Sequence, residues 1–384
     1  MFFEFATATR IIFGNGVLAQ AGVLAAEMGR RALVVIGSTA TRASPLIEQL
    51  AACGVESSVF SVLGEPTIEV ACAGTERARQ DRCDVVVGFG GGSVLDAAKA
   101  VAALLSNEGE PLDYLEIVGR GRPLANPSAP YMAIPTTAGT GAEVTRNAVL
   151  ASPQHRLKVS LRGPYMLPRL ALVDPELTHS LPPKLTASTG LDALTQLVEP
   201  FVSNKANPLT DAFCREGIGR AARSLRRACE HGDDAAARED MSLASLLGGL
   251  ALANAKLGVV HGLAGVVGGM FPAPHGAVCA CLLPHVMAAN VQALRLRQPG
   301  SLALRRYDEI GQLLTGNVAA GAVDAIVWVR ELCEALQILS LSAYGLTEQD
   351  FPLLVEKAQT ASSTQGNPVQ LAEAELGEVL AQAL

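Results

Sequence analysis

Residues 84–99 of the chain read Asp-Val-Val-Val-Gly-Phe-Gly-Gly-Gly-Ser-Val-Leu-Asp-Ala-Ala-Lys, an apolar strand pattern that runs through three consecutive glycines into a helical pattern. Glycines let the backbone turn sharply and approach a ligand without a Cβ atom in the way. We expect Ser93 to cap the helix that follows, whose free N–H groups and dipole favour an anion. The stretch therefore predicts a turn that holds a pyrophosphate, and with it a nucleotide-binding protein.

Strand and helix patterns alternate around this turn. Strand patterns occupy residues 31–37, 55–62, 84–88 and 131–135, and helical patterns occupy residues 45–53, 67–80 and 93–106. Strands separated by helices predict a mostly parallel, Rossmann-like sheet with helices on both faces. Ligands of such sheets bind at the carboxyl ends of the strands, where the glycine turn lies.

The pattern changes after Asp174-Pro175. A turn signal at residues 181–184 (Leu-Pro-Pro-Lys) precedes long helical patterns over residues 185–203, 208–230 and 241–257. Few strand patterns interrupt them, so the second half is expected to be all-helical. We predict two domains, an α/β domain over residues 1–180 and a helical domain over residues 181–384.

Composition narrows the class of protein. The 384 residues carry 30 Lys and Arg against 37 Asp and Glu, a net charge of −7, and only 4% are aromatic, which argues against a nucleic-acid partner. The first ten residues lack the basic segment of a signal peptide. The longest apolar region, residues 243–271, is interrupted by Asn254, Lys256 and His261, so we interpret it as buried helix rather than a membrane span. A cytoplasmic protein with no membrane partner is expected.

The eight cysteines are scattered and include no Cys-x-x-Cys pair. Cys279 and Cys281 are separated by one residue, which is too tight for a usual zinc pair. In a chain of this length the cysteines are interpreted as reduced, mostly buried, small apolar residues.

A second glycine-rich segment, residues 134–147, also follows a strand pattern and reads Ile-Pro-Thr-Thr-Ala-Gly-Thr-Gly-Ala-Glu-Val-Thr-Arg-Asn. The hydroxyl groups of Thr136, Thr137, Thr140 and Thr145 offer donors and acceptors to ribose and amide groups. One such segment is equally typical of an ordinary polar loop. Two at successive strand ends favour a nucleotide site.

Two further segments carry candidate metal ligands. Asp192 and Gln196 are four residues apart in a helical pattern and share one face. Because a lone carboxylate among apolar neighbours is costly, Asp192 is either hydrogen-bonded or a metal ligand. His261 and His275 lie beside glycines in a very apolar stretch, where a histidine is either a satisfied core residue or a ligand. A metal site and ordinary core positions both remain open on this evidence.

The four segments together resemble the iron-containing (group III) alcohol dehydrogenase family. The resemblance extends over nearly the whole chain, from residues 10–14 (Arg-Ile-Ile-Phe-Gly) to residues 283–286 (Leu-Pro-His-Val) and beyond. It implies a dehydroquinate synthase-like architecture, in which the N-terminal α/β domain binds NAD(P) and the helical C-terminal domain holds a divalent metal, Fe or Zn. The active site is expected between the two, and a homodimer or larger homo-oligomer is expected.

Carried over by position, the resemblance assigns roles to individual residues. Gly91, Gly92 and Ser93 would hold the pyrophosphate. Asp192, His261 and His275 would be both metal ligands and catalytic residues, with Gln196 at the fourth ligand position. The other expected cofactor-binding residues are Gly37, Thr39, Asp96, Thr136, Thr137, Thr140, Thr145, Asn147 and Lys158.

The chain departs from the family pattern at two positions. Gln196 stands where the family usually has His, and an amide oxygen is a poorer ligand for iron or zinc than imidazole. Gly265 stands where many members carry a His that is thought to relay the proton, so the proton route is unassigned.

The resemblance implies an NAD(P)-dependent oxidoreductase that interconverts a small alcohol and its aldehyde or ketone by hydride transfer. The two departures leave open a metal-free reductase similar to maleylacetate reductase, or a nucleotide-binding sensor without catalysis. A dehydroquinate synthase-like lyase needs a cluster of Lys and Arg, whereas the segments around Asp192 and His261 are apolar.

Cofactor preference is expected to depend on residues 37–39, Gly-Ser-Thr. Members that prefer NAD often carry an Asp at position 37 to accept a ribose hydroxyl, and that acid is missing here. The small residues leave room for a 2′-phosphate, with Arg42 as its partner, so the sequence favours NADP. Arg42 as a merely solvated residue is the alternative.

Overall fold

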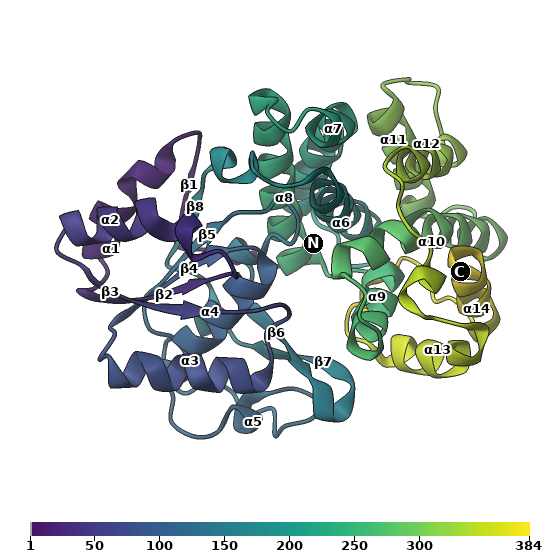
Figure 1. The fold of residues 1–384 in the computed structure, drawn as a ribbon. Coiled ribbons are helices and arrows are strands. Elements are labelled where there is room, and N and C mark those ends of the chain that lie inside the picture. Colours follow the sequence, from purple (N-terminus) through teal and green to yellow (C-terminus); the bar gives the residue numbers. More distant parts are fainter. Residues whose placement is uncertain (1) are drawn as a thin grey trace. The chain divides into compact units, whose positions relative to one another are not determined.

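The computed structural model describes residues 2–384, which form two compact units (Figure 1). The α/β unit comprises Ala6–Thr137 and Gly141–Thr178. The helical unit comprises residues 2–5, Ala138–Thr140 and His179–Leu384. The helical unit therefore contains chain from both halves of the sequence, whereas the α/β unit ends at Thr178.

The α/β unit is built on a six-stranded, fully parallel sheet with the strand order β1-β8-β5-β4-β2-β3. The predicted parallel sheet is confirmed. The sequence patterns did not identify β1, which is an edge strand, or β8, which lies next to it. The strands are β1 (Arg10–Phe13), β2 (Arg31–Ile36), β3 (Glu56–Ser61), β4 (Val85–Gly90), β5 (Tyr131–Pro135) and β8 (Leu170–Val173).

Helices cover both faces of this sheet, as predicted (Figure 1). The helices of the unit are α1 (Ala21–Ala26), α2 (Ser44–Ala52), α3 (Ile68–Gln80), α4 (Gly92–Leu105) and α5 (Pro111–Tyr114). α1 and α2 pack on one face through Leu24, Leu46 and Leu50, and α3 and α4 pack on the other through Ala78 and Leu95. Because β4 and β5 lie between two apolar layers, every residue of both strands is buried.

An antiparallel hairpin of β6 (Asn147–Ser152) and β7 (Leu157–Arg162) is attached to α4 by buried polar contacts. The Nζ atom of Lys99 donates to Ala142 O, Thr145 Oγ1 and Asn147 O, each at 2.8 Å. Asp96 Oδ2 accepts from the amide of Val149 at 3.0 Å. Burial raises the pKa of Asp96 to about 6, against the opposing effect of the Lys99 charge.

The helical unit contains nine α-helices in the described part of the chain. They are α6 (Pro183–Val202), α7 (Pro208–Glu230), α8 (Ala235–Ala255), α9 (Val259–Met270), α10 (His275–Arg297), α11 (Leu302–Thr315), α12 (Ala322–Ala335), α13 (Phe351–Thr360) and α14 (Glu373–Ala383). The predicted all-helical second half is confirmed. The helix starts carry local signals, since Asn207 caps α7 and Asp234 caps α8 with their side chains.

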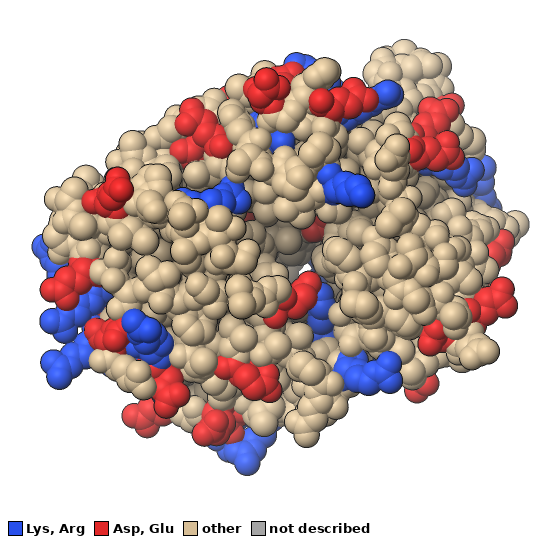
Figure 2. All heavy atoms as spheres, viewed as in Figure 1, with Lys and Arg blue, Asp and Glu red and all other residues tan. Residues whose placement is uncertain are grey.

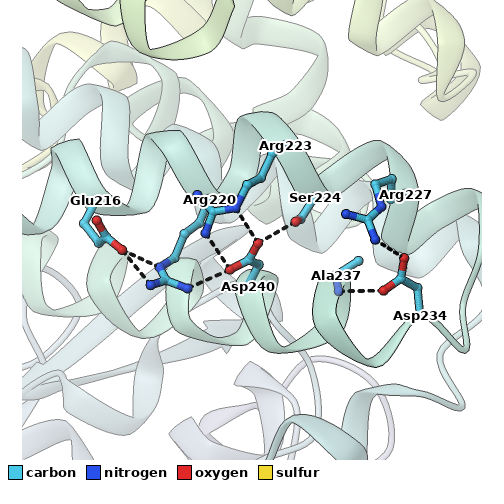
Figure 3. Close-up of polar contacts among 8 residues, drawn as sticks. All are labelled: Glu216, Arg220, Arg223, Ser224, Arg227, Asp234, Ala237 and Asp240. Atoms are coloured by element: carbon cyan, nitrogen blue, oxygen red, sulfur yellow. Dashed lines mark hydrogen bonds and ion pairs between the residues drawn. The ribbon is translucent and has the colours of Figure 1, made fainter. Parts of the chain in front are cut away.

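Ion pairs join α7 to α8 along their exposed sides (Figure 3). Asp240 accepts from Arg220, from Nε and Nη2 of Arg223 and from Ser224, at 2.6 to 2.8 Å. Arg227 similarly reaches Asp234 (Figure 3). Exposed pairs of this kind contribute about 0–1 kcal/mol each, so they fix how the helices align more than they stabilise the fold.

The apolar region over residues 243–271 is predominantly buried helix, as predicted, and is divided between α8 and α9. α8 and α9 meet at an angle of 100°. Lys256 lies in the left-handed region at φ 61°, and the backbone at Gly258 passes so close to Glu199 that a Cβ atom there would lie 2.8 Å from Glu199 Oε1. The break places the first turn of α9 against α6.

α10 is long and apolar enough to cross a membrane by length and composition, with 72% of its most apolar window buried inside the protein. The core helix of a globular unit has the same properties. On the face drawn in Figure 2, acidic and basic side chains are interspersed among other residues.

Candidate metal centre and glycine-rich turn

One buried face of α6 carries three polar side chains. Asp192, Gln196 and Glu199 occur at positions i, i+4 and i+7, and their exposed fractions are 2%, 3% and 5%. Residues at this spacing line one side of a helix. Because burying carboxylates is costly unless they are paired, this face needs partners from other helices.

His261 and His275 supply those partners. His261 lies in the first turn of α9, and its Nε2 atom is 3.4 Å from Asp192 Oδ1. His275 is the first residue of α10, and its Nε2 atom is 3.8 Å from the same oxygen. The two imidazole rings lie 5.5 Å apart between centroids. The structure thus brings together three of the four residues predicted as ligands, Asp192, His261 and His275.

Cys279 belongs to the same cluster, although the sequence analysis interpreted it only as a buried apolar residue. It lies one turn after His275 on α10, with Sγ 3.7 Å from His275 Nε2. One ligand atom from each of Asp192, His261, His275 and Cys279 lies within 4.8 Å of all the others. The i, i+4 spacing of His275 and Cys279 was the sequence signal that could have found it. All eight cysteines are free, four of them buried and four partly buried.

Glu199 is a second residue that the sequence analysis missed. Its Oε1 atom accepts from the amide of Val260, and its Oε2 atom lies 2.7 Å from His261 Nδ1. A carboxylate is an acceptor, so His261 donates through Nδ1 and leaves the lone pair of Nε2 facing Asp192. The spacing of seven residues from Asp192 was the available sequence signal.

The cluster leaves buried polar atoms without hydrogen-bond partners. Asp192 Oδ1, Gln196 Oε1 and His261 Nε2 are all in this state. Each such atom costs about 1–3 kcal/mol when unsatisfied. Burial acts to raise the pKa of Asp192, but the neighbouring His261 and His275 outweigh it and lower that pKa. An ionised carboxylate beside two imidazoles fits a divalent cation such as Fe²⁺ or Zn²⁺.

The glycine-rich turn connects β4 directly to α4. β4 ends at Gly90, Gly91 occupies the N-cap position, and α4 begins at Gly92. A Cβ atom at Gly90 would lie 2.6 Å from the Val94 side chain, which explains the need for glycine there. The prediction that Ser93 caps the helix is wrong, because the turn is so short that Ser93 falls inside the first helical turn. No side chain therefore caps the N-terminus of α4, and its first amides can bind an anionic ligand.

Strand register places several predicted cofactor residues at one edge of the sheet. Ile36 pairs with Phe89 and Gly90 pairs with Pro135, so Gly37, Gly91 and Thr136 follow adjacent strands. The amide of Thr136 donates to Gly90 O at 2.9 Å. The chain order reverses between β2 and β4, and such a switch point is where open α/β sheets bind nucleotides.

The other residues that were predicted to bind the cofactor make contacts with different parts of the protein. Asp96, Thr145 and Asn147 make the buried contacts between α4 and the hairpin described above. Lys158 pairs with Glu65 at 3.1 Å. Thr140 belongs to the helical unit, whereas Thr136 and Thr137 belong to the α/β unit and Thr39 lies in the exposed segment after β2.

Comparison with known proteins gives matches over nearly the whole chain. Residues 8–175 match the family described as "Iron-containing alcohol dehydrogenase", and residues 186–384 match "Fe-containing alcohol dehydrogenase family, C-terminal". Alcohol dehydrogenase 4 of Schizosaccharomyces pombe is 34% identical over 97% of this chain and 87% of its own length. The 1,3-propanediol dehydrogenase of Klebsiella pneumoniae is 33% identical over 97% of this chain and 96% of its own length. A crystal structure of a 1,3-propanediol oxidoreductase superposes with a TM-score of 0.92 at 32% identity and covers all of both chains.

Proposed function

The chain belongs to the iron-containing alcohol dehydrogenase family, and from this we propose that it transfers hydride between NAD(P) and a small, weakly charged alcohol or its aldehyde, with a divalent metal held by Asp192, His261 and His275. The family is one of oxidoreductases that use NAD(P) and a metal such as iron. The proposal concerns the substrate class and the residues that carry the reaction.

One observation supports the metal most strongly. The unpartnered Asp192 Oδ1 and His261 Nε2 atoms lie 3.4 Å apart in a buried cluster with His275. A metal-free reductase would leave these atoms unsatisfied, at a cost that a bound cation removes. When bound, a divalent metal supplies a Lewis acid that polarises the substrate carbonyl.

The chain's own residues orient this chemistry. Glu199 fixes the tautomer of His261, and the lowered pKa of Asp192 keeps the carboxylate in its ligand form at neutral pH. Gly91, Gly92 and Ser93 would bind the pyrophosphate through backbone amides, which aims the nicotinamide end of the cofactor. Thr136 and Thr137 would line the dinucleotide, and Gly37 leaves space beside it.

The test is NAD(P)H oxidation with short aldehydes by the purified protein, before and after chelation and with added Fe²⁺ or Zn²⁺. We expect aldehyde-dependent loss of NAD(P)H absorbance that chelation abolishes and metal restores. Full activity after complete metal removal would favour the metal-free reductase. Cofactor binding without turnover of any aldehyde or alcohol would favour the sensor.

We further propose that the enzyme accepts NADP. Position 37 carries no acid to repel a 2′-phosphate, and Ser38 and Thr39 are exposed. The Arg42 side chain donates to Leu177 O at 2.9 Å from an exposed position near this segment. Arg42→Ala should raise KM for NADPH several-fold more than KM for NADH. Equal effects on both cofactors would identify Arg42 as a structural residue.

A homodimer or larger homo-oligomer and a cytoplasmic location complete the proposal. Eight free cysteines are typical of a reducing compartment. Light scattering of the purified protein and fractionation of its cells of origin test these two points, and a monodisperse monomer would contradict the first.

A further inference from the structure

The fourth ligand position is the unusual feature of this metal centre. The residue one turn after Asp192 on α6 is Gln196, whose neutral amide oxygen is a poor ligand for iron or zinc. Cys279 reaches the same cluster from α10. We propose that Cys279 is a thiolate ligand, so that the centre is an Asp192–His261–His275–Cys279 site that favours Zn²⁺ over Fe²⁺.

The distances in the cluster match those of a tetrahedral site. Metal–N and metal–O bonds of about 2.1 Å and a metal–S bond of about 2.3 Å place N and O donors about 3.4 Å apart, and N and S donors about 3.6 Å apart. Asp192 Oδ1 is 3.4 Å from His261 Nε2 and 3.8 Å from His275 Nε2. His275 Nε2 is 3.7 Å from Cys279 Sγ. Small movements of side chains suffice to close the site on a cation.

Local packing holds the two α10 ligands in place. His275 and Cys279 occupy one face of the first turns of α10. Between them, a Cβ atom at Gly276 would lie 2.5 Å from Ser188 O and 3.3 Å from Asp192 Cβ, so the backbone of α10 packs directly on α6. Cys279 is fully buried, and its sulfur lies 3.7 Å from His275 Nε2 inside the cluster.

Thiolate chemistry accounts for the metal preference. On binding, the S–H bond of Cys279 breaks, a sulfur–metal bond forms, and the proton passes to water. A thiolate is softer than carboxylate, amide or imidazole ligands and selects zinc over metals that prefer oxygen and nitrogen. Gln196 is then a neighbour of the site that does not bind the metal.

Cobalt substitution of the full-length protein tests this ligand set directly. Co²⁺ bound to a thiolate gives a sulfur-to-metal charge-transfer band in the near ultraviolet, whereas Co²⁺ bound to N and O ligands does not. We expect the band in the wild-type protein and in Gln196→Ala, and its loss in Cys279→Ser. Cys281→Ser is the matched control, because Cys281 is buried on the same helix and donates to Ala383 O outside the cluster.

Chelator competition gives the second readout. Loss of an outer-sphere partner typically lowers metal affinity about 10–100-fold, so Cys279→Ser should lose at least this much Zn²⁺ affinity while Cys281→Ser keeps it. The difference between Zn²⁺ and Fe²⁺ affinity should also shrink in Cys279→Ser. A wild-type cobalt protein without the band overturns the proposal, as does greater loss of affinity in Gln196→Ala than in Cys279→Ser. If Cys279→Ser does not fold by circular dichroism, the wild-type spectrum alone decides.

This inference takes the position of the metal from the proposed function. Experiments can nevertheless refute the ligand set and the function independently of each other. Aldehyde reduction is measured on the same cobalt and zinc preparations. Activity without the charge-transfer band removes Cys279 from the ligands and leaves the proposed function standing. The band without turnover of any substrate leaves the ligand set standing and removes the proposed function.

Discussion

The Nδ1 atom of His261 lies 2.7 Å from the Oε2 atom of Glu199, and this contact decides which nitrogen of the ring faces the metal cluster. The other Glu199 oxygen holds the amide of Val260, so one side chain fixes both the start of α9 and the direction of its histidine. Metal-binding histidines commonly rely on such a partner. Glu199 is therefore as much a part of the centre as the ligands that it orients.

Replacing Glu199 tests this role. In Glu199→Gln the oxygen can still accept from Val260, but the amide NH₂ then faces His261 Nδ1 and favours the tautomer with a proton on Nε2. We expect roughly a 10–100-fold loss of metal affinity with the fold retained. Chelator competition and circular dichroism measure the two quantities. Glu216→Gln on the exposed side of α7 is the control, and equal metal affinity in both variants would contradict the assignment.

The close contact of α10 with α6 predicts unequal effects of adding one methyl group. Gly276→Ala would place Cβ 2.5 Å from a backbone oxygen, whereas a Cβ at Gly265 meets no atom within 4 Å. Gly276→Ala should destabilise the protein by about 1–3 kcal/mol and weaken metal binding, because the backbone that carries His275 must move. Gly265→Ala should be neutral or stabilise α9 by up to about 1 kcal/mol. Urea unfolding measures the stability of both variants. Equal unfolding midpoints would show that the contact between α10 and α6 relaxes to accept the methyl group.

Substitution of Gly91 by a larger residue should weaken cofactor binding. A Cβ atom at this position would lie 3.2 Å from the Thr137 side chain, and the branches of a valine would fill the space above the first amides of α4. Gly91→Val should weaken NAD(P)H binding at least tenfold in a fluorescence titration, while metal content is unchanged. Gly377→Ala, at an open position of α14, is the control. Normal NAD(P)H affinity in Gly91→Val would place the pyrophosphate elsewhere.

The buried carboxyl of Glu143 should make the free energy of unfolding depend on pH. Burial raises the pKa of this carboxyl from 4.5 to about 7, against the lowering effects of a backbone hydrogen bond and Lys99. The folded protein keeps a proton that the unfolded chain releases in this window, so stability falls as pH rises through it, by roughly 3 kcal/mol at most. Glu143→Gln cannot ionise and should escape that loss.

The free energy of unfolding of Glu143→Gln minus that of the wild type should therefore increase from about pH 5 to about pH 8. Glu56→Gln, whose side chain is largely exposed, should show no such trend. A difference for Glu143→Gln that stays constant with pH would mean that the carboxyl is already ionised in the folded protein.

The sequence predicted the parallel sheet, the helical second half and three residues that meet in one cluster. The sheet and the helices depend on local patterns, such as apolar strand runs and glycines at strand ends, whereas the three residues were assigned from the resemblance to the family. Glu199 was missed because its role depends on the packing of α9 against α6, and a carboxylate on one helix does not reveal the imidazole on another. Cys279 shares α10 with His275, but its spacing alone does not distinguish a ligand from a buried apolar residue. Ser93 was misassigned because a capping residue and a residue one position inside a helix look alike until the length of the turn is known.

The predicted helix end at residue 257 lies two residues beyond the end of α8, but α9 was not identified as a separate helix. The turn between them combines a left-handed backbone at Lys256 with the close passage of Gly258 beside Glu199, and neither is visible in the sequence pattern. β1 and β8 are only four residues long, and β1 pairs with β8, which lies about 160 residues away in sequence, while β8 also pairs with β5.

Ala138–Thr140 belong to the helical unit, although the residues on either side belong to the α/β unit. Within the helical unit, Gly139 packs against Thr189, where even a methyl group would collide. A fragment that ends near residue 180 would contain Ala138–Thr140 without the helices of the unit to which these residues belong. The complementary fragment, with the helices, would lack these three residues. The protein is consequently a poor source of interchangeable modules, because the chain passes between the units at four places and a swap with a relative requires all four junctions to be rebuilt together.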